Sequence, residues 1–144
     1  MKQHRLRSAA GFTLLEILLV VIIIGMLVGV AVVKLGGVSA TARQTTARRQ
    51  IDAYKTAIGL YEFHNGNYPS TEQGLAALVT QPSGQPAPTN WQGPYIDPPV
   101  LRKDPWNRDY IYKFPGQKLP SGYDLYSVGA NGIEGDDDDI GNWQ

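Results

Sequence analysis

Four consecutive aspartates, Asp136 to Asp139, are the densest group of possible metal ligands in this 144-residue sequence. Like charges this close repel one another, so the segment is either a solvated tail or a loop gathered by a cation. Calcium suits it, because calcium takes about six to eight oxygen ligands in flexible geometry. The run is not an EF-hand, since no Asp-x-Asp-x-Asp-Gly loop with a later glutamate is present. Spacing alone favours the solvated tail and leaves calcium open.

The side chains that most enzymes and zinc sites use are scarce. The sequence has no cysteine, and its two histidines are His4 and His64. A disulfide, a thiolate nucleophile and a Cys-ligated zinc are therefore excluded, and zinc or copper is disfavoured at the acidic run, which has no histidine nearby. His64 lies beside a turn, where a solvated or capping histidine is expected rather than a catalytic base. With no phosphate loop, nucleophile elbow or His-Glu-x-x-His pattern either, the sequence indicates a protein that is not an enzyme.

Nucleic-acid binding is not indicated. The formal net charge is zero, so no overall positive field attracts a polyanion. Three arginines, Arg43, Arg48 and Arg49, form a small basic patch. Three charges on one helix are typical of a solvated face, and no nucleic-acid partner is expected.

Glu16 is a carboxylate at the edge of an apolar segment. From Ile17 to Val33 every residue is apolar or glycine. With residues 12–15 included, the segment reaches the about 20 residues that a membrane-crossing helix needs. Lys2, Arg5 and Arg7 precede it, so this end is expected in the cytoplasm and the rest of the chain outside.

Two simpler interpretations of the apolar segment are a secretory signal peptide and an uncleaved signal anchor. A signal peptide has a cleavage site of small residues after its apolar run, and residues 38–40 match such a site weakly. Neither alternative accounts for the Gly11-Phe12 pair before the run or for Glu16 within its first turns.

Residues 39–63 have the spacing of an amphipathic helix, because apolar residues recur at intervals of three and four. The resulting stripe consists of Ala47, Ile51, Tyr54, Ile58 and Tyr61. Residues 65–69, Asn-Gly-Asn-Tyr-Pro, predict the end of the helix.

The remaining residues predict a short helix and a small antiparallel sheet. Ser70 and Gln73 have capping-box spacing ahead of a helix that continues to Val79. Residues 110–112 and 123–128 are β-prone, and residues 115–122 between them predict a hairpin connection. A helix with one apolar stripe must bury it against another layer, so we expect an α+β domain. In its core, the stripe from Ile51 to Tyr61 would face Leu75, Leu78, Ile111 and Leu125, while Trp106 would anchor the loop before the first strand.

Residues 11–16, Gly-Phe-Thr-Leu-Leu-Glu, behind a basic leader and ahead of an apolar helix, resemble the class III signal of type IV pilins and pseudopilins. Later segments narrow the resemblance to the major pseudopilins of type II secretion systems. These segments are residues 68–78, 104–106, 123–127, 138–140 and 142–143. The resemblance covers nearly the whole chain and implies a pilin-like α+β fold.

This resemblance implies four regions: a cleaved leader over 1–11, a transmembrane and assembly helix over 12–35, the amphipathic half of the long helix over 36–65, and a globular α+β region over 66–144. A prepilin peptidase would cut between Gly11 and Phe12 and methylate the new amine of Phe12. Glu16 would then pair with the Phe12 amine of a neighbouring subunit in a helical filament. A charged carboxylate is costly in hydrocarbon unless a group of opposite charge lies beside it, and the amine would be that group.

The expected partners are further copies of the chain, the inner membrane, the minor pseudopilins and the secretion assembly platform. The filament would lie in the periplasm and help to drive folded proteins across the outer membrane. The alternative is the major subunit of a type IV surface pilus for adhesion, motility or DNA uptake. Many such pilins have a C-terminal disulfide loop, which this chain cannot form.

The resemblance also implies one Ca²⁺ at the C-terminal loop. Carried over by position, its ligands would be Ser127, the Val128 carbonyl, Asn131, Asp138 and Asp139, with Asp136 and Asp137 facing solvent. Three positions depart from the family: Val33 replaces a frequent proline, Asn107-Arg108 replaces Gly-Asn after Trp106, and Asn131 replaces a frequent aspartate. A neutral amide lowers the ligand charge, so weaker calcium binding is expected than in a relative with aspartate there.

Overall fold

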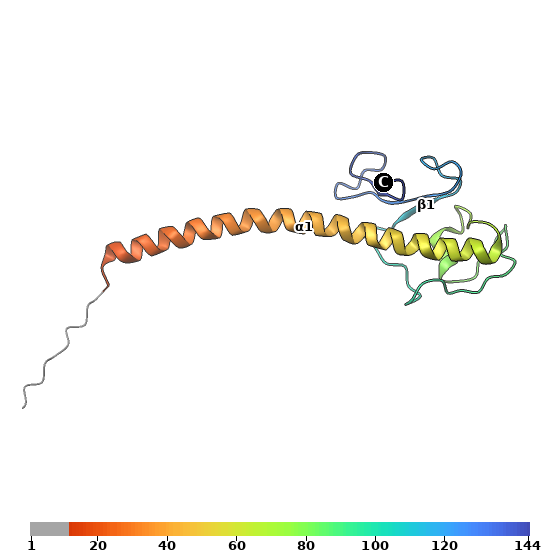
Figure 1. Cartoon of the computed structure of the whole chain (residues 1–144), viewed down its shortest axis with the longest axis horizontal. Coiled ribbons are helices and arrows are strands. Elements are labelled where there is room, and N and C mark those ends of the chain that lie inside the picture. The colour runs from red at the N-terminus through yellow and green to blue at the C-terminus, as the bar shows by residue number, and fades with distance from the viewer. Residues whose placement is uncertain (1–11) are drawn as a thin grey trace, which may run out of the picture. The chain divides into compact units, whose positions relative to one another are not determined.

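The computed structural model describes residues 12–144, and within them the side chains of 12–27 and 39–144. The predicted leader, Gly11 included, lies outside the described residues. The elements in chain order are α1 (Leu14–Asn65), the 3-10 helix η1 (Gly74–Leu78), and the strands β1 (Ile111–Lys113), β2 (Asp124–Ser127) and β3 (Ile140–Gly141) (Figure 1). In the part of the chain that is described, no helix is both long enough and apolar enough to cross a membrane.

Polar groups define both ends of α1. At its start, the hydroxyl of Thr13 accepts a hydrogen bond from the Glu16 amide at 3.2 Å, so Thr13 caps a first turn that carries one carboxylate. At its end, Gly66 adopts a positive φ of 76° and donates its amide to the Glu62 carbonyl at 2.7 Å. A glycine in this conformation is a common helix stop, as the Asn-Gly-Asn-Tyr-Pro segment predicts.

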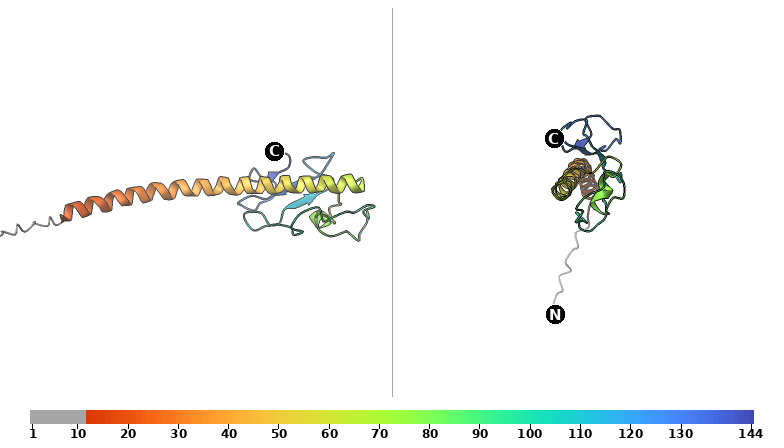
Figure 2. Two further views of the ribbon diagram at one scale, coloured as in Figure 1. Left: turned by 60° about the horizontal axis from the view of Figure 1, so that its bottom comes forward. Right: turned by 90° about the vertical axis from the view of Figure 1, so that its right-hand side faces the viewer.

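Residues 40–144 form one compact unit, whose core is built on a single face of α1. The predicted stripe is confirmed, and Ala57 joins it: Ala47, Ile51, Tyr54, Ala57, Ile58 and Tyr61 are all at most 2% exposed. In the two views of Figure 2, η1, the sheet and the loops of this unit cover that face of the helix. Edge-to-face contacts join Tyr54 to Tyr110 at 5.5 Å and Tyr61 to Tyr95 at 5.6 Å between ring centroids. Such pairs stabilise a core beyond the area that they bury.

The two reciprocal hydrogen bonds of the predicted capping box are present, but they close the turn before η1, whose N-cap residue is Gln73 and not Ser70. The Gln73 amide donates to the Ser70 hydroxyl at 3.3 Å, and the Ser70 amide donates back to the Gln73 side-chain oxygen at 3.0 Å. The helix that follows, η1, is a single short 3-10 segment that ends at Leu78, one residue before the predicted limit. Its Leu75 and Leu78 are buried in the core, as expected.

The sheet has the order β1-β2-β3, and both pairings are antiparallel. Ile111 was expected in the core, and this expectation is wrong. Tyr112 lies opposite Leu125, and both are buried on the core face, whereas Ile111 lies opposite Tyr126 on the other face. Because side chains alternate along a strand, burying Tyr110 and Tyr112 turns Ile111 outward.

Asp124 holds the hairpin between β1 and β2. Its carboxylate is buried and accepts hydrogen bonds from the backbone amides of Gln117, Lys118 and Leu119, at 2.6 to 2.9 Å. A Cβ at Gly116 would lie 2.6 Å from this carboxylate, so the turn requires glycine there. The predicted hairpin connection is therefore confirmed, and it is fixed by one charged side chain.

Strand β3 was not expected from the sequence. This strand has two residues, which pair with Tyr126 and Ser127 of β2. The Asn142 side chain extends the ladder, because its oxygen accepts the Leu125 amide at 3.0 Å and its nitrogen donates to the Tyr123 carbonyl at 2.9 Å. A strand this short has no periodicity to read, and it exists only because β2 offers a free edge.

The buried tyrosines make the stability of this unit sensitive to alkali. Burial raises the pKa of Tyr110 and Tyr112, and it raises the pKa of Tyr123 to about 12. Since unfolded tyrosine titrates near pH ~10, the stability that these protons provide is complete below that pH and is lost as the pH rises through the folded pKa values. We predict cooperative unfolding between about pH 10 and 12, measured by circular dichroism and tyrosinate absorbance. The same chain in guanidinium should titrate smoothly near ~10; smooth titration of the native chain with unchanged dichroism would contradict the prediction.

Candidate functional site

The segment between β2 and β3, residues 128–139, is the candidate metal site, and we call it the acidic loop. Its ends are joined by the antiparallel pair of Ser127 and Ile140. The residues just inside this pair therefore lie opposite one another, so that Val128 faces Asp139. The sheet therefore brings together the predicted ligands from the first and last residues of the loop.

Asp139 has the strongest feature of a cation ligand. It is only 6% exposed, and its Oδ2 accepts the Gly135 amide at 2.7 Å. Its Oδ1 is buried without a hydrogen-bond partner. A buried carboxylate oxygen left unpaired is costly, and a bound cation would remove that cost. The chemistry of this group fits calcium.

Asp138 lies beside the start of the loop. Its Oδ2 accepts the Asn131 amide at 3.0 Å. Its backbone and carboxylate also crowd Gly129, where a Cβ would collide with both. Gly129 has a φ of +62° as well, so conformation and space both require glycine at this position.

Two of the predicted ligands are already engaged in the protein. Ser127 is fully buried, and its hydroxyl donates to Asp104 Oδ2 at 2.5 Å. Asn131 is exposed; its oxygen accepts the Ile133 amide at 2.8 Å, and its nitrogen donates to Asp136 at 2.6 Å. Neither side chain is free to bind a cation unless these bonds are shared or exchanged.

Asp136 and Asp137 are exposed, as expected. Asp136 is nevertheless part of the loop, because its Oδ1 accepts the Asp138 amide at 2.9 Å. Across the described residues, no three acidic, histidine or cysteine side chains converge closely enough to hold a metal. A cation here would depend on Asp138 and Asp139 together with backbone carbonyls.

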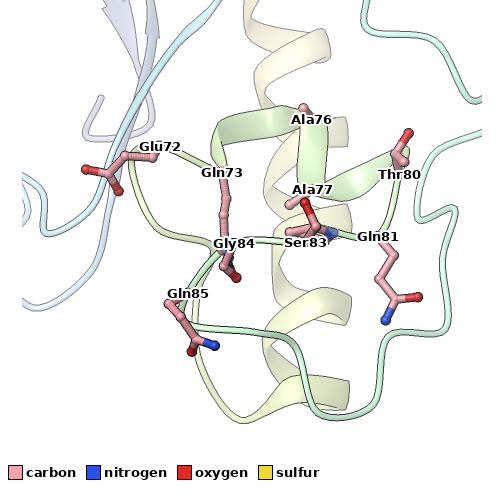
Figure 3. A pocket seen from close by; sticks show the side chains of 10 residues that line it. Glu72, Gln73, Ala76, Ala77, Thr80, Gln81, Ser83, Gly84 and Gln85 are labelled. Atoms are coloured by element: carbon pink, nitrogen blue, oxygen red, sulfur yellow. Dashed lines mark hydrogen bonds between the residues drawn. The ribbon is translucent and has the colours of Figure 1, made fainter.

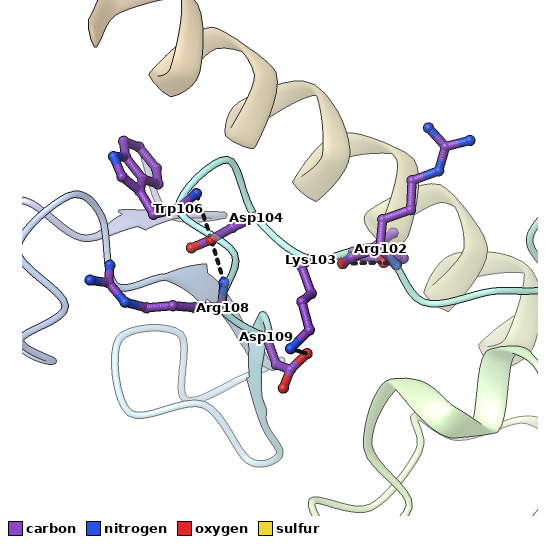
Figure 4. Close-up of polar contacts among 7 residues, drawn as sticks. Arg102, Lys103, Asp104, Trp106, Arg108 and Asp109 are labelled. Atoms are coloured by element: carbon purple, nitrogen blue, oxygen red, sulfur yellow. Dashed lines mark hydrogen bonds and ion pairs between the residues drawn. The ribbon is translucent and has the colours of Figure 1, made fainter.

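Asp104 organises the structure next to the acidic loop, a role that was not expected from the sequence. It is 5% exposed, and its Oδ1 accepts the backbone amides of Trp106 at 3.0 Å and Arg108 at 2.8 Å (Figure 4). Its other oxygen receives the Ser127 hydroxyl. One buried carboxylate thus shapes the 104–108 turn and fastens it to the end of β2. The Asp-Pro-Trp segment was the available signal, but its contact with Ser127 depends on the tertiary fold.

The departure from the family at residues 107–108 falls in this turn. Asn107 has a φ of +67°, a conformation that asparagine adopts more readily than most residues. Asn107 can therefore stand where the family often has glycine. Arg108 follows, and its guanidinium reaches the acidic loop, donating to the Gly129 carbonyl at 2.5 Å.

The N-terminal residues Phe12 and Glu16 form a second candidate site. Every described side chain from Phe12 to Leu27 is exposed, and the large apolar ones are 46% to 86% exposed. Glu16 is the acidic residue in the first turn of α1, where a negative charge favours the helix end. Among the described residues, no cationic group pairs with its carboxylate.

The other polar features have structural roles. His64 contacts the Tyr95 hydroxyl at 3.3 Å and is half-buried. Arg48 of the basic patch donates to the side chain of Gln144 at 3.3 Å. A depression of about 330 Å³ between η1 and residues 80–85 is lined by amide, hydroxyl and small side chains, with Glu72 at its edge (Figure 3). Gln73 spans its floor by donating to the carbonyls of Gly84 and Pro86. None of these groups forms a pair of catalytic acid and base.

Comparison with known proteins agrees with this geometry. Residues 34–143 match the family model for type II secretion system (T2SS), protein G. The chain is 45% identical over 141 residues to the type II secretion system core protein G of Pseudomonas aeruginosa, covering 95% of this chain and 96% of that relative. It is 43% identical to the protein of the same name from Vibrio cholerae, covering 96% and 94% of the two chains.

A solved structure supports the fold. The chain is similar to the crystal structure of the major pseudopilin from the type 2 secretion system of enterohaemorrhagic Escherichia coli, with a TM-score of 0.67 and 38% identity. The similarity covers 74% of this chain and 87% of that one. The predicted pilin-like α+β fold is confirmed, and the secretion pseudopilin is favoured over the surface pilin. The chain therefore belongs to the family of type II secretion system protein G, as a structural pseudopilin and not as an enzyme.

Proposed function

We propose that this chain is the repeating subunit of a pseudopilus that is anchored in the inner membrane before assembly. The observation that carries the proposal is the row of exposed apolar side chains from Phe12 to Leu27, interrupted by the single carboxylate of Glu16. An apolar surface of this extent requires a lipid or protein neighbour. In the sequence the run continues through Val33 behind a basic leader, which supports a single membrane pass with a cytoplasmic N-terminus and a periplasmic C-terminal unit.

Assembly would transfer this apolar surface from lipid to neighbouring copies of the same helix. The expected accessory proteins are the prepilin peptidase, the minor pseudopilins and the secretion assembly platform. Growth of the filament would then help to move folded proteins across the outer membrane.

The first test concerns processing. We predict cleavage between Gly11 and Phe12 and monomethylation of the Phe12 amine, because the motif lies before the apolar run, where a cytoplasmic-face peptidase can reach it. Intact-mass measurement of the purified protein should show loss of residues 1–11 and gain of one methyl group. A Gly11→Leu variant should keep its leader, and Gly25→Ala should be processed normally. A mature protein that starts near Thr41 would indicate an ordinary signal peptide.

Glu16 supplies the second test. A charge at the centre of a membrane helix costs about 2.5–3.5 kcal/mol, and somewhat less near its end, unless it finds a partner. Four helical residues separate Glu16 from Phe12 by ~6 Å along the axis. A neighbour shifted by about one helical turn would therefore bring its Phe12 amine to this carboxylate.

We expect Glu16→Ala to insert and be cleaved normally but to form filaments at less than about a tenth of the wild-type yield, since the loss of one such pair costs over 1.4 kcal/mol. Sheared filament yield, normalised to processed protein, is the measurement. The control is Asp52→Ala, which removes an acid of the same helix whose side chain is 71% exposed. Wild-type yield from Glu16→Ala would mean that the carboxylate only reaches the headgroups.

The third test concerns calcium. We propose that Asp138, Asp139 and the Val128 carbonyl hold one Ca²⁺, with Asn131 and Ser127 as further oxygen donors. The unpaired Oδ1 of Asp139 supports this assignment. Calcium, when bound, would offset two of the four negative charges of the acidic run, while Gly129 and Gly135 let the backbone turn tightly around the carboxylates.

Binding to the folded state alone stabilises it by about 2.7 kcal/mol at a hundredfold excess over Kd. The full chain in detergent should therefore melt roughly 10 °C higher with calcium than with EGTA. Asp138→Ala/Asp139→Ala should abolish this difference. Asp137→Ala removes an exposed carboxylate of the same run and should preserve it. If the wild type melts at the same temperature in both buffers and calorimetry shows no heat of calcium binding, the four aspartates are a solvated segment and not a calcium site.

A further inference from the structure

Arg108 brings a positive charge from outside the acidic loop into contact with its backbone. Its Nη1 donates to the Gly129 carbonyl at 2.5 Å, and its Nη2 donates to the Ala130 carbonyl at 3.4 Å. A Cβ at Gly132 would lie 2.7 Å from the guanidinium carbon, so the loop closes around this group. The guanidinium thus occupies the inside of the 129–132 turn.

The position of Arg108 is fixed by the turn that carries it. Its amide donates to Asp104 Oδ1 at 2.8 Å, and its carbonyl accepts the Asp104 amide at 2.8 Å. In Figure 4, Arg108 and Arg102 leave this segment in opposite directions, Arg108 toward the loop after β2 and Arg102 away from it. Asp104 is also bonded to Ser127, so one buried residue holds both the arginine and the strand that leads into the loop.

The guanidinium of Arg108 donates its hydrogen bonds to backbone carbonyls and not to a carboxylate. The salt bridges within the described residues join Lys55 to Asp52, Lys103 to Asp109 and Lys113 to Glu134, and none includes Arg108. A planar guanidinium presents donors in a fixed fork, so it can bridge two adjacent carbonyls as a small cation would. Four aspartates in the same loop add a favourable long-range attraction.

We propose that Arg108 is a built-in cation of the acidic loop, which keeps the turn from Gly129 to Gly132 folded when no metal is bound. A second consequence rests on the calcium site proposed above. Gly129 and Ala130 lie between the proposed ligands Val128 and Asn131, so the guanidinium and Ca²⁺ stabilise the same turn. Calcium should therefore add less to the stability of this chain than to that of a variant without the arginine.

Hydrogen exchange of the full chain in detergent with EGTA tests the first part. Hydrogen bonds to a charged donor protect a loop by roughly tenfold to hundredfold, so Arg108→Gln should speed exchange in residues 128–135 by about that factor. Arg102→Gln removes the same charge from the same segment and should leave the loop unchanged. Arg108→Lys keeps the charge but has no fork, and an intermediate effect is expected. Exchange at the wild-type rate in Arg108→Gln would overturn the proposal.

Melting with 2 mM CaCl₂ tests the second part. We expect the calcium-dependent rise in melting temperature to be larger in Arg108→Gln than in the wild type, by roughly 5 °C. An equal rise in the wild type and in Arg108→Gln would show that the arginine and calcium stabilise separate parts of the unit. That result would contradict the proposal that they stabilise the same turn. If calcium raises the melting temperature of neither the wild type nor Arg108→Gln, the proposed metal site is wrong. The hydrogen-exchange result still decides the role of Arg108 in that case. Failure of both Arg108 variants to fold even with calcium would overturn the proposal, since a cation confined to the loop leaves the helix and sheet core intact.

Discussion

The C-terminal unit depends on hydrogen bonds that buried carboxylates accept from backbone amides. Its sheet consists of three strands of two to four residues, which is too little to order the long connections around it. The Asp124 carboxylate accepts hydrogen bonds from three amides of the hairpin loop, and the Asp104 carboxylate accepts two from the turn before β1. Each such bond to an ionised acceptor is stronger than a neutral one, and together these bonds satisfy the two buried carboxylates. These two turns are held by a carboxylate placed inside them, whereas the segment before them packs on the core through Trp91, Tyr95 and Ile96.

The two parts of α1 meet different requirements. Within residues 40–65, one face packs against the sheet and η1, and its tyrosines also use their hydroxyls: Tyr54 bonds to both the amide and the carbonyl of Arg102. From Phe12 to Leu27 the described side chains are exposed, and all except those of Thr13 and Glu16 are apolar or glycine. The first part is complete within one chain, whereas the second needs other molecules to cover it. This division fits a pseudopilin, a subunit that assembles with other copies into a pseudopilus.

Much of this arrangement follows from local sequence. The stripe from Ile51 to Tyr61, the reciprocal hydrogen bonds of Ser70 and Gln73, and the hairpin before Asp124 rest on short-range spacing, and all are present. Ile111 was misplaced because a three-residue strand has two equally plausible registers, and only packing of Tyr110 and Tyr112 selects one. β3 pairs with residues of β2 that lie 13 or more positions before it. Asp104 contacts Ser127 at the end of β2, 23 positions away, and Arg108 contacts Gly129 in the loop that follows, 21 positions away, so no local pattern reveals these contacts.

Because buried carboxylates, and not disulfides, hold the turns of this unit, its folding does not depend on an oxidising compartment. A domain stapled by disulfides must wait for an oxidising compartment and for the correct pairing of its thiols. Here Asp104 and Asp124 bond to backbone amides two to seven residues away, and no electron transfer is involved. Because the chain has no cysteine, formation of these bonds is independent of the redox potential and needs neither a thiol oxidase nor a disulfide isomerase.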